Sequence, residues 1–324
     1  MNRGTTNRPL SPGATRMTDA HRPRRAGLAL VAGLLIAMIG GTAHAATVAH
    51  WTFDGGTVGD SLTSDTDIAN SITVDQFDGN AINPGDDVEY IAGPSGFGTA
   101  ANFDNATNGN DGEGSALSSA DGLTSSLVGL SALTIEAFVF VETDTTLSGA
   151  NNIFRKSDQS YDGISGDLDD GYTLVLVDGQ LQIRLGRGGQ DPNATDDFAA
   201  VRADSAITKG EWVHVAGTWD GSTGDMKLFV DYTEVAASQV GSLPTSLTGT
   251  LSGASNDGPA SIGALVRSPG GPAVGAEGQF FDGSIDEVRI SDEALSPSAF
   301  IPEPATVGLL AVGGVVMLAR RRRN

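Results

Sequence analysis

The stretch "GEWVHVAGTWDGSTGDMKLFVD" (Gly210–Asp231) decides the fold of this chain. Its two apolar runs are separated by the polar segment Asp220–Asp225, which contains two glycines. Short apolar runs bounded by glycine and aspartate are typical of strands joined by a tight turn. A second turn is expected at Asp231-Tyr232, and a third strand continues to Ala236. This region therefore predicts consecutive antiparallel strands.

Two segments upstream show the same pattern. In "LTIEAFVFVE" (Leu133–Glu142) every second residue is apolar, which predicts a strand with one buried face. In "YTLVLVDGQLQIRLG" (Tyr172–Gly186) two apolar runs flank Asp178-Gly179, a pair typical of a two-residue hairpin turn. Only "SDEALS" (Ser291–Ser296) favours a helical turn, with its first serine as the N-cap. Many short antiparallel strands predict an all-β sandwich or jelly roll.

Composition agrees with this class and limits the partners. The 324 residues include 44 glycines and no cysteine, so disulfides contribute nothing to stability. Residues 1–45 contain six Arg and one Asp, and residues 302–324 contain four Arg and one Glu, which leaves 38 acidic and 9 basic residues between them. We expect no nucleic-acid partner, because a segment with a net charge of −29 cannot neutralise phosphates. Divalent cations, neutral sugars and cationic surfaces are compatible with it.

The N-terminal 45 residues have the layout of a secretory signal peptide. Arg22, Arg24 and Arg25 lie just before the apolar run Leu28–Ile39, and Ala43 and Ala45 form an A-x-A cleavage site. Cleavage after Ala45 places the mature domain at residues 46–301. The segment ahead of the arginines is long, which leaves Met17 as an alternative start. An uncleaved anchor helix is the alternative to cleavage.

A second targeting segment occupies residues 302–324. Its apolar stretch 305–319 is shorter than the ~20 residues of a full span and predicts a transient transmembrane anchor. Before this stretch lies the triplet Pro302, Glu303 and Pro304. We expect this triplet to be extended, because proline stiffens the chain. A cationic cluster follows it and stays on the cytoplasmic side: Arg320, Arg321, Arg322 and Arg323. An ordinary tail anchor is the alternative interpretation.

The triplet, the apolar helix and the arginine cluster, in this order, resemble the PEP-CTERM sorting signal. In that family an exosortase is thought to recognise the triplet and process the protein for the cell surface. The resemblance implies the export machinery and an exosortase-type enzyme as partners. It implies a final location at the cell surface, in the outer envelope or in the extracellular matrix.

The body resembles the laminin-G-like, concanavalin-A-like jelly rolls of bacterial surface proteins over about residues 47–300. "VAHWTFD" (Val48–Asp54) matches the first strand, "ALTIEAFVFVE" (Ala132–Glu142) a middle strand, and "FDGSIDEVRISDEALS" (Phe281–Ser296) the closing strand. The segment Gly210–Asp231 matches the most distinctive hairpin of that family. One departure is Asp231-Tyr232, where the family has Asp-Gly. Because a left-handed tyrosine costs roughly 1 kcal/mol, a turn of another type is expected there.

Acidic segments are the candidate calcium sites. The loops Asp104–Gly114 and Ser157–Tyr172 crowd oxygen ligands into glycine-containing turns, and calcium takes six to eight oxygens. The second loop contains three candidate ligands: Asp167, Asp169 and Asp170. Neither loop has EF-hand spacing, and a solvated acidic rim is the alternative. The family resemblance implies a structural calcium near the chain ends, which points to Asp54 and Asp286.

Aromatic residues and histidines favour structural roles. Trp51, Trp212 and Trp219 each lie in a predicted strand, where a large ring fills core space. Trp219 lies beside a turn and is the weak candidate for a platform that stacks on sugar. His214 lies between two valines and is expected to be a hydrogen-bonded framework residue. Without cysteine or a spaced histidine pair, a zinc site is unsupported.

No catalytic residues are assigned. Retaining glucanases with this type of fold carry E-x-D-x-x-E on one strand, with the two carboxylates about 5–5.5 Å apart. Glu136 and Glu142 have no acid midway between them. Asp286 and Glu287 are adjacent, so they are expected to point to opposite faces of their strand.

These observations predict an exported, non-catalytic recognition or adhesion module that binds a polysaccharide or a surface protein. A structural component of an extracellular matrix or biofilm, without a discrete ligand, is the second interpretation. A divergent glycoside hydrolase is the third. Calcium is the expected structural ion.

Overall fold

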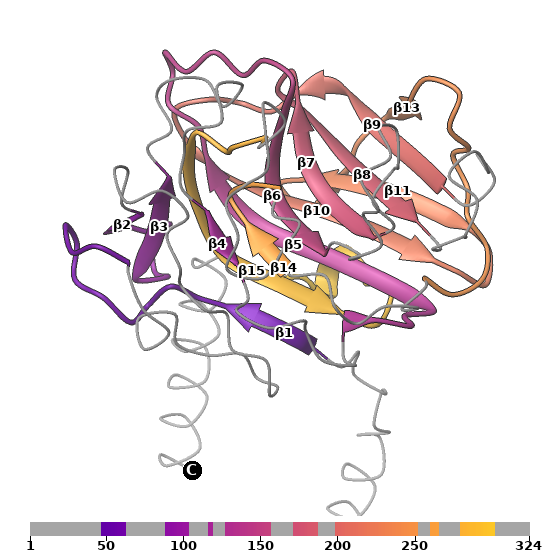
Figure 1. Ribbon diagram of the computed structural model, residues 1–324, viewed down its shortest axis with the longest axis horizontal. Coiled ribbons are helices and arrows are strands. Elements are labelled where there is room, and N and C mark those ends of the chain that lie inside the picture. Colours follow the sequence, from indigo (N-terminus) through magenta and orange to yellow (C-terminus); the bar gives the residue numbers. More distant parts are fainter. Residues whose placement is uncertain are drawn as a thin grey trace, which may run out of the picture. The chain divides into compact units, whose positions relative to one another are not determined.

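The computed structural model describes residues 47–62, 88–103, 116–118, 127–156, 171–186, 198–251, 260–265 and 279–301. Within these residues the chain forms fifteen strands in two antiparallel sheets (Figure 1). Apolar residues of both sheets share one continuous core. The predicted all-β sandwich is confirmed.

The first sheet is built around the long strand β5, between β10 and β15. Its strands follow the order β12 (Thr233–Glu234), β11 (Asp225–Val230), β10 (Trp212–Asp220), β5 (Ala132–Phe140), β15 (Gly283–Ser291), β3 (Thr99–Phe103) and β2 (Glu89–Ala92). β1 (Thr47–Trp51) also pairs with β15, so the first and last strands of the domain are neighbours.

The second sheet contains the predicted hairpin at Asp178-Gly179. Its strands follow the order β13 (Ala237–Gln239), β9 (Phe198–Ala206), β8 (Gln180–Gly186), β7 (Tyr172–Val177), β6 (Ala150–Lys156), β14 (Ala260–Ile262) and β4 (Leu117–Ser118). Strand β13 forms one edge of this sheet, and its three residues are exposed.

The alternation in β5 places apolar side chains against the second sheet. Every apolar residue predicted for the buried face is fully buried: Leu133, Ile135, Ala137, Val139 and Val141. The large rings of Trp51 and Trp219 are also fully buried, and Trp51 stacks against Phe154 of the second sheet at a centroid distance of 5.8 Å. Burial of these rings adds to that of the aliphatic side chains that make up most of the core.

Two hairpins each have two turn residues in the left-handed conformation. Asp178 and Gly179 have φ angles of 52° and 81°, as the sequence predicts for this pair. Asp231 and Tyr232 have φ angles of 46° and 62°, so the expectation of another turn type is wrong. The Tyr232 ring stacks on His214 at 4.3 Å and an interplanar angle of 6°, and Asp231 accepts the His214 backbone N–H. These contacts offset the strain of a left-handed tyrosine.

We expect Tyr232→Gly to lower the free energy of unfolding by about 1–2 kcal/mol, because the lost ring contacts outweigh the relieved strain. Thermal unfolding measures this difference. Tyr232→Phe keeps the ring and should leave the melting temperature nearly unchanged. A glycine variant at least as stable as the wild type would show that the stack contributes nothing.

The helical turn predicted at 291–296 is also wrong. The Thr134 hydroxyl donates to the Glu293 carbonyl at 2.6 Å and accepts the Leu295 N–H at 2.8 Å, so this backbone bonds to β5 instead of to itself. A short 3₁₀ helix, Pro297–Ala299, begins one residue later. Proline at its first turn suits that start.

Candidate functional site

Asp286 lies at the centre of an acidic cluster on the first sheet. Its side chain is fully buried, and its Oδ1 accepts the Glu287 N–H at 2.8 Å. Its Oδ2 is buried and has no hydrogen-bond partner among the described residues. A β-carbon on Gly93 would lie 2.9 Å from this Oδ2 and 3.2 Å from the Gly98 carbonyl oxygen. Oδ2 therefore faces the backbone of the turn between β2 and β3.

A β-bulge places Glu287 beside Asp286. Between Asp286 and Arg289 the pairing with β5 shifts by one residue, and Glu287 has a left-handed φ of 51°. Glu287 is the extra residue, and its Oε2 lies 2.6 Å from Nε2 of His50 on β1. Both acidic side chains thus belong to one cluster, and the prediction that they point to opposite faces is wrong. A bulge changes the period of two on which that prediction depended.

Asp54 reaches the same cluster from the end of β1. Its Oδ1 accepts the Thr99 N–H at 3.2 Å, and the Thr99 hydroxyl donates to the Phe53 carbonyl at 2.6 Å. Phe53 has a left-handed φ of 49°, although it is a bulky residue. Left-handed non-glycine residues next to both Asp54 and Asp286 are strained, and such strain is concentrated at functional sites.

Burial and neighbouring charges raise the pKa of two of these acids. Burial first, and then the charges of Glu287 and Asp54, raise the pKa of Asp286 to about 10, although the backbone N–H of Glu287 opposes this shift. Partial burial also raises the pKa of Asp54, together with the charge of Glu287, while the Thr99 N–H and His50 oppose the shift. A bound cation would remove this penalty by pairing with the carboxylates.

The donors present are of the kind that calcium prefers. Carboxylate and carbonyl oxygens meet at one turn, and the unpartnered Oδ2 of Asp286 is an open acceptor. Among the residues that the structure describes, no three His, Asp or Glu side chains already stand in a metal-binding arrangement. A cation here would therefore combine Asp54 and Asp286 with a backbone oxygen, such as the Gly98 carbonyl.

Several predicted residues lie outside the described ranges. These are the loop acids Asp167, Asp169 and Asp170, the signal residues Ala43 and Ala45, the triplet Pro302, Glu303 and Pro304, and the cluster Arg320, Arg321, Arg322 and Arg323. The expected helix at 305–319 also lies there. In the portion that is described, no helix has the length and apolar character needed to cross a membrane.

Trp219 is not available to a ligand in this structure. Its ring is fully buried, and its Nε1 donates to the Leu247 carbonyl at 2.6 Å. The ring therefore serves the core, and its candidacy as a sugar platform is corrected. His214 is buried as well, and its Nε2 lies 3.0 Å from Oε2 of Glu136. It is a hydrogen-bonded framework residue, as expected.

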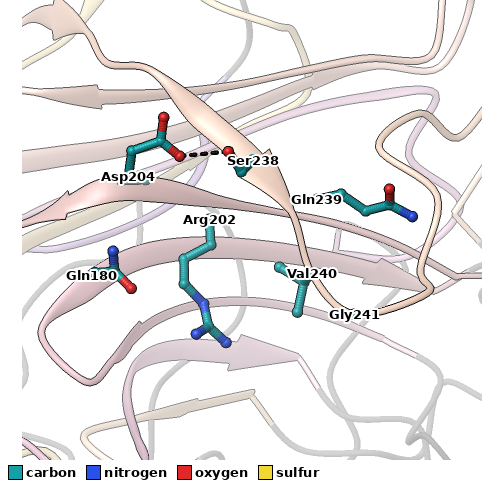
Figure 2. Close-up of a pocket in the computed structure, with 8 residues that line it drawn as sticks. Gln180, Arg202, Asp204, Ser238, Gln239, Val240 and Gly241 are labelled. Carbon is teal, nitrogen blue, oxygen red and sulfur yellow. Dashed lines mark hydrogen bonds between the residues drawn. The ribbon is translucent and has the colours of Figure 1, made fainter.

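A polar pocket on the second sheet was not predicted from the sequence. The pocket has a volume of about 260 Å³ and is open to solvent. Figure 2 shows the Asp204 carboxylate of β9 directed at Ser238 of the edge strand β13, while the Arg202 side chain of β9 extends away from this pair, on the side of Gln180 of β8. Its remaining lining residues are Ala203, Gln239, Val240 and Gly241.

Hydrogen bonds hold the side chains of this pocket in place. The Arg202 Nε donates to Gln182 at 2.9 Å, and the Ser238 hydroxyl donates to Asp204 at 2.6 Å (Figure 2). Gln182, Arg202 and Ser238 lie opposite one another across β8, β9 and β13. Cross-strand register brings together residues that are far apart in sequence, which explains why no local motif revealed the pocket.

Comparison with family models identifies both parts of the chain. Residues 111–299 match the model of the concanavalin A-like lectin/glucanases superfamily. The chain belongs to this superfamily. Residues 300–323 match the PEP-CTERM protein-sorting motif, which implies export and processing by an exosortase. No curated protein matches the chain.

Several solved structures are similar to this chain at low identity. Domain 4 of AbnA, a GH43 extracellular arabinanase from Geobacillus stearothermophilus in complex with arabinotriose, is 22% identical, with a TM-score of 0.44 over 79% of this chain and 97% of that one. The CBM40 of the Ruminococcus gnavus IT-sialidase bound to α2,3 sialyllactose is 15% identical, with a TM-score of 0.37 over 55% and 83%. A pentraxin from Limulus polyphemus is 19% identical, with a TM-score of 0.35 over 53% and 68%.

Proposed function

We propose that this superfamily member is an exported, non-catalytic carbohydrate-recognition module that acts at the cell surface or in the extracellular matrix. The observation that carries the proposal is the polar pocket of the second sheet. Its lining combines guanidinium, amide, hydroxyl and carboxylate groups, which supply both donors and acceptors of the kind that bind sugar hydroxyls. Arg202 and Asp204 are the central contacts, with Gln180 and Gln239 at the sides.

The size and surroundings of the pocket favour one or two units of a longer glycan. Its volume of about 260 Å³ lies just below the ~300–1,000 Å³ of small-molecule sites. Its open side leaves room for a glycan chain to continue into solvent.

In the described ranges, Val58 is the only large apolar side chain that is exposed. Recognition by hydrogen bonds therefore has more support here than docking of an apolar partner.

We expect Arg202→Ala to weaken glycan binding at least tenfold, because a hydrogen bond to a charged group contributes about 1.5–3 kcal/mol. A glycan microarray with neutral and uronic-acid oligosaccharides finds the ligand, and titration calorimetry compares the variants. Arg202→Lys keeps the charge but loses the planar donor fork, so it should also bind weakly.

Ser205→Ala is the matched control, because Ser205 is an exposed neighbour on β9 outside the pocket. Equal affinities of the Arg202 and Ser205 variants would place the ligand elsewhere. Self-association without any glycan preference would favour the matrix-protein interpretation. Release of reducing ends from a glycan would instead reveal a hydrolase.

The proposal includes a structural calcium ion held by Asp54, Asp286 and the Gly98 carbonyl. The ion would neutralise the buried carboxylate and tie the end of β1 to the turn between β2 and β3. Calcium binding by the acidic loop with Asp167, Asp169 and Asp170 remains a separate prediction.

A further inference from the structure

The last residues before the sorting triplet are packed on the outer face of the first sheet. Phe300 is 3% exposed, and its ring centroid lies 5.1 Å from that of Phe229 and 5.5 Å from that of His214. Tyr232 and Leu295 complete this small apolar cluster, which is separate from the main core. The chain segment Ala299–Ile301 is therefore part of the folded domain.

Charged side chains hold the backbone on both sides of Phe300. The Ile301 N–H donates to Oε2 of Glu136 at 2.9 Å, and Arg289 donates to the Ala299 carbonyl at 2.7 Å. Arg289 also donates from Nε to Oε1 of Glu136 at 2.7 Å. The fully buried Glu136 carboxylate on β5 thus connects β15, His214 on β10 and the segment Ala299–Ile301, which we call the tail.

The tail contributes to the stability of the buried Glu136 carboxylate. Burying a carboxylate is costly unless it is paired and hydrogen-bonded. Glu136 is satisfied only by Arg289, His214 and the Ile301 N–H together, so the tail completes the buried network. Removing the tail would leave one carboxylate oxygen with a lone partner, His214.

The docked residues belong to the sorting motif itself. The motif match begins at residue 300, whereas the domain match ends at residue 299. Phe300 and Ile301 are therefore the first two residues of the motif, and Pro302 of the triplet follows directly in the sequence.

We propose that Glu136 and Arg289 form a dock for Ala299–Ile301 that fixes the point at which the sorting signal leaves the domain. They are positioning residues, because they act through the backbone of the tail. The dock keeps the residues just before Pro302 out of a protease cleft, since Phe300 and Ile301 are buried and the Ala299 carbonyl and the Ile301 N–H are hydrogen-bonded. It confines processing to bonds beyond Ile301, and the product keeps its C-terminal residues bound to the domain. This inference depends on the sorting motif and is independent of the glycan pocket.

Limited proteolysis of the full chain in detergent tests the dock. Proteinase K hydrolyses accessible peptide bonds with water, and intact mass spectrometry reports the C-terminal limit of the resistant fragment. We expect that limit at or beyond Ile301 in the wild type. In Ile301→Pro, which lacks the N–H, and in Phe300→Ala, it should move upstream of Pro297. Ile301→Val retains the N–H and should match the wild type.

Two further readouts separate positioning from stability. Hydrogen exchange should show a protected Ile301 amide in the wild type, a measurement that holds even if a variant fails to fold. In cells with the processing enzyme, the wild type and Ile301→Val should yield one C-terminal species, and Ile301→Pro several, even at a temperature well below the melting temperature of that variant. A wild-type fragment that ends before Ala299, an unprotected Ile301 amide, or one shared C-terminus in all variants would overturn the proposal.

Discussion

Replacing Asp286 with asparagine is expected to raise the melting temperature of the calcium-free protein by roughly 5–10 °C and to abolish its response to calcium. At neutral pH the buried Asp286 must either take up a proton or keep an unpaired charge, because burial and two acidic neighbours raise its pKa to about 10. Asparagine avoids this penalty and still accepts the Glu287 N–H. We expect a gain of about 2–4 kcal/mol.

Thermal unfolding of residues 46–301, with calcium and with excess chelator, measures both effects. Saturating calcium should stabilise the wild type by about 2.7 kcal/mol at a hundredfold excess over its dissociation constant, and it should leave the Asp286→Asn protein unchanged. Glu293→Gln, which changes an exposed acid near the end of the same strand, is the control. An asparagine variant that is less stable than the wild type in chelator, or that still responds to calcium, would contradict the proposed site.

The same group makes stability depend on pH. The carboxyl of Asp286 is protonated in the folded state up to a pKa of about 10, whereas the unfolded chain loses this proton near the ordinary value of 3.8. Folding therefore takes up a proton between these values, and the stability of the calcium-free protein falls as the pH rises through this range. Because calcium competes with the proton, its stabilising effect should be larger near about pH 8 than near about pH 5.5.

The second large effect is expected at Trp219. Trp219→Ala should lower the free energy of unfolding by about 3–5 kcal/mol, since it leaves a cavity and removes a hydrogen-bond donor to Leu247. Denaturant unfolding measures this loss. Trp212→Ala is the comparison, because Trp212 is only partly buried and packs on Phe140 at 5.7 Å. A fully folded Trp219 variant that has lost only glycan binding would restore the ligand role.

Period-two patterns predicted much of the fold because burial enforces them. The apolar positions of β5 and the hairpin at Asp178-Gly179 were predicted from local sequence alone. Tyr232 was not, because its left-handed turn is stabilised by a ring on the neighbouring strand β10. Stabilisation by a distant ring has no signal in the turn sequence itself.

The candidate sites were less predictable than the strands. Family resemblance pointed to Asp54 and Asp286, and the structure brings them together through the pairing of β1 with β15. Glu287 joins them only because of a bulge, which follows from three-dimensional packing. The pocket was missed because β8, β9 and β13 each contribute only a few ordinary polar residues to it.

The most direct test of the central claim is nuclear magnetic resonance of ¹⁵N-labelled residues 46–301 titrated with the best glycan from the array. Glycan recognition at the second sheet predicts that amide shifts concentrate at Gln180, Arg202–Asp204 and Ser238–Gly241. Shifts confined to the turn between β2 and β3, or no shift with any glycan, would contradict it.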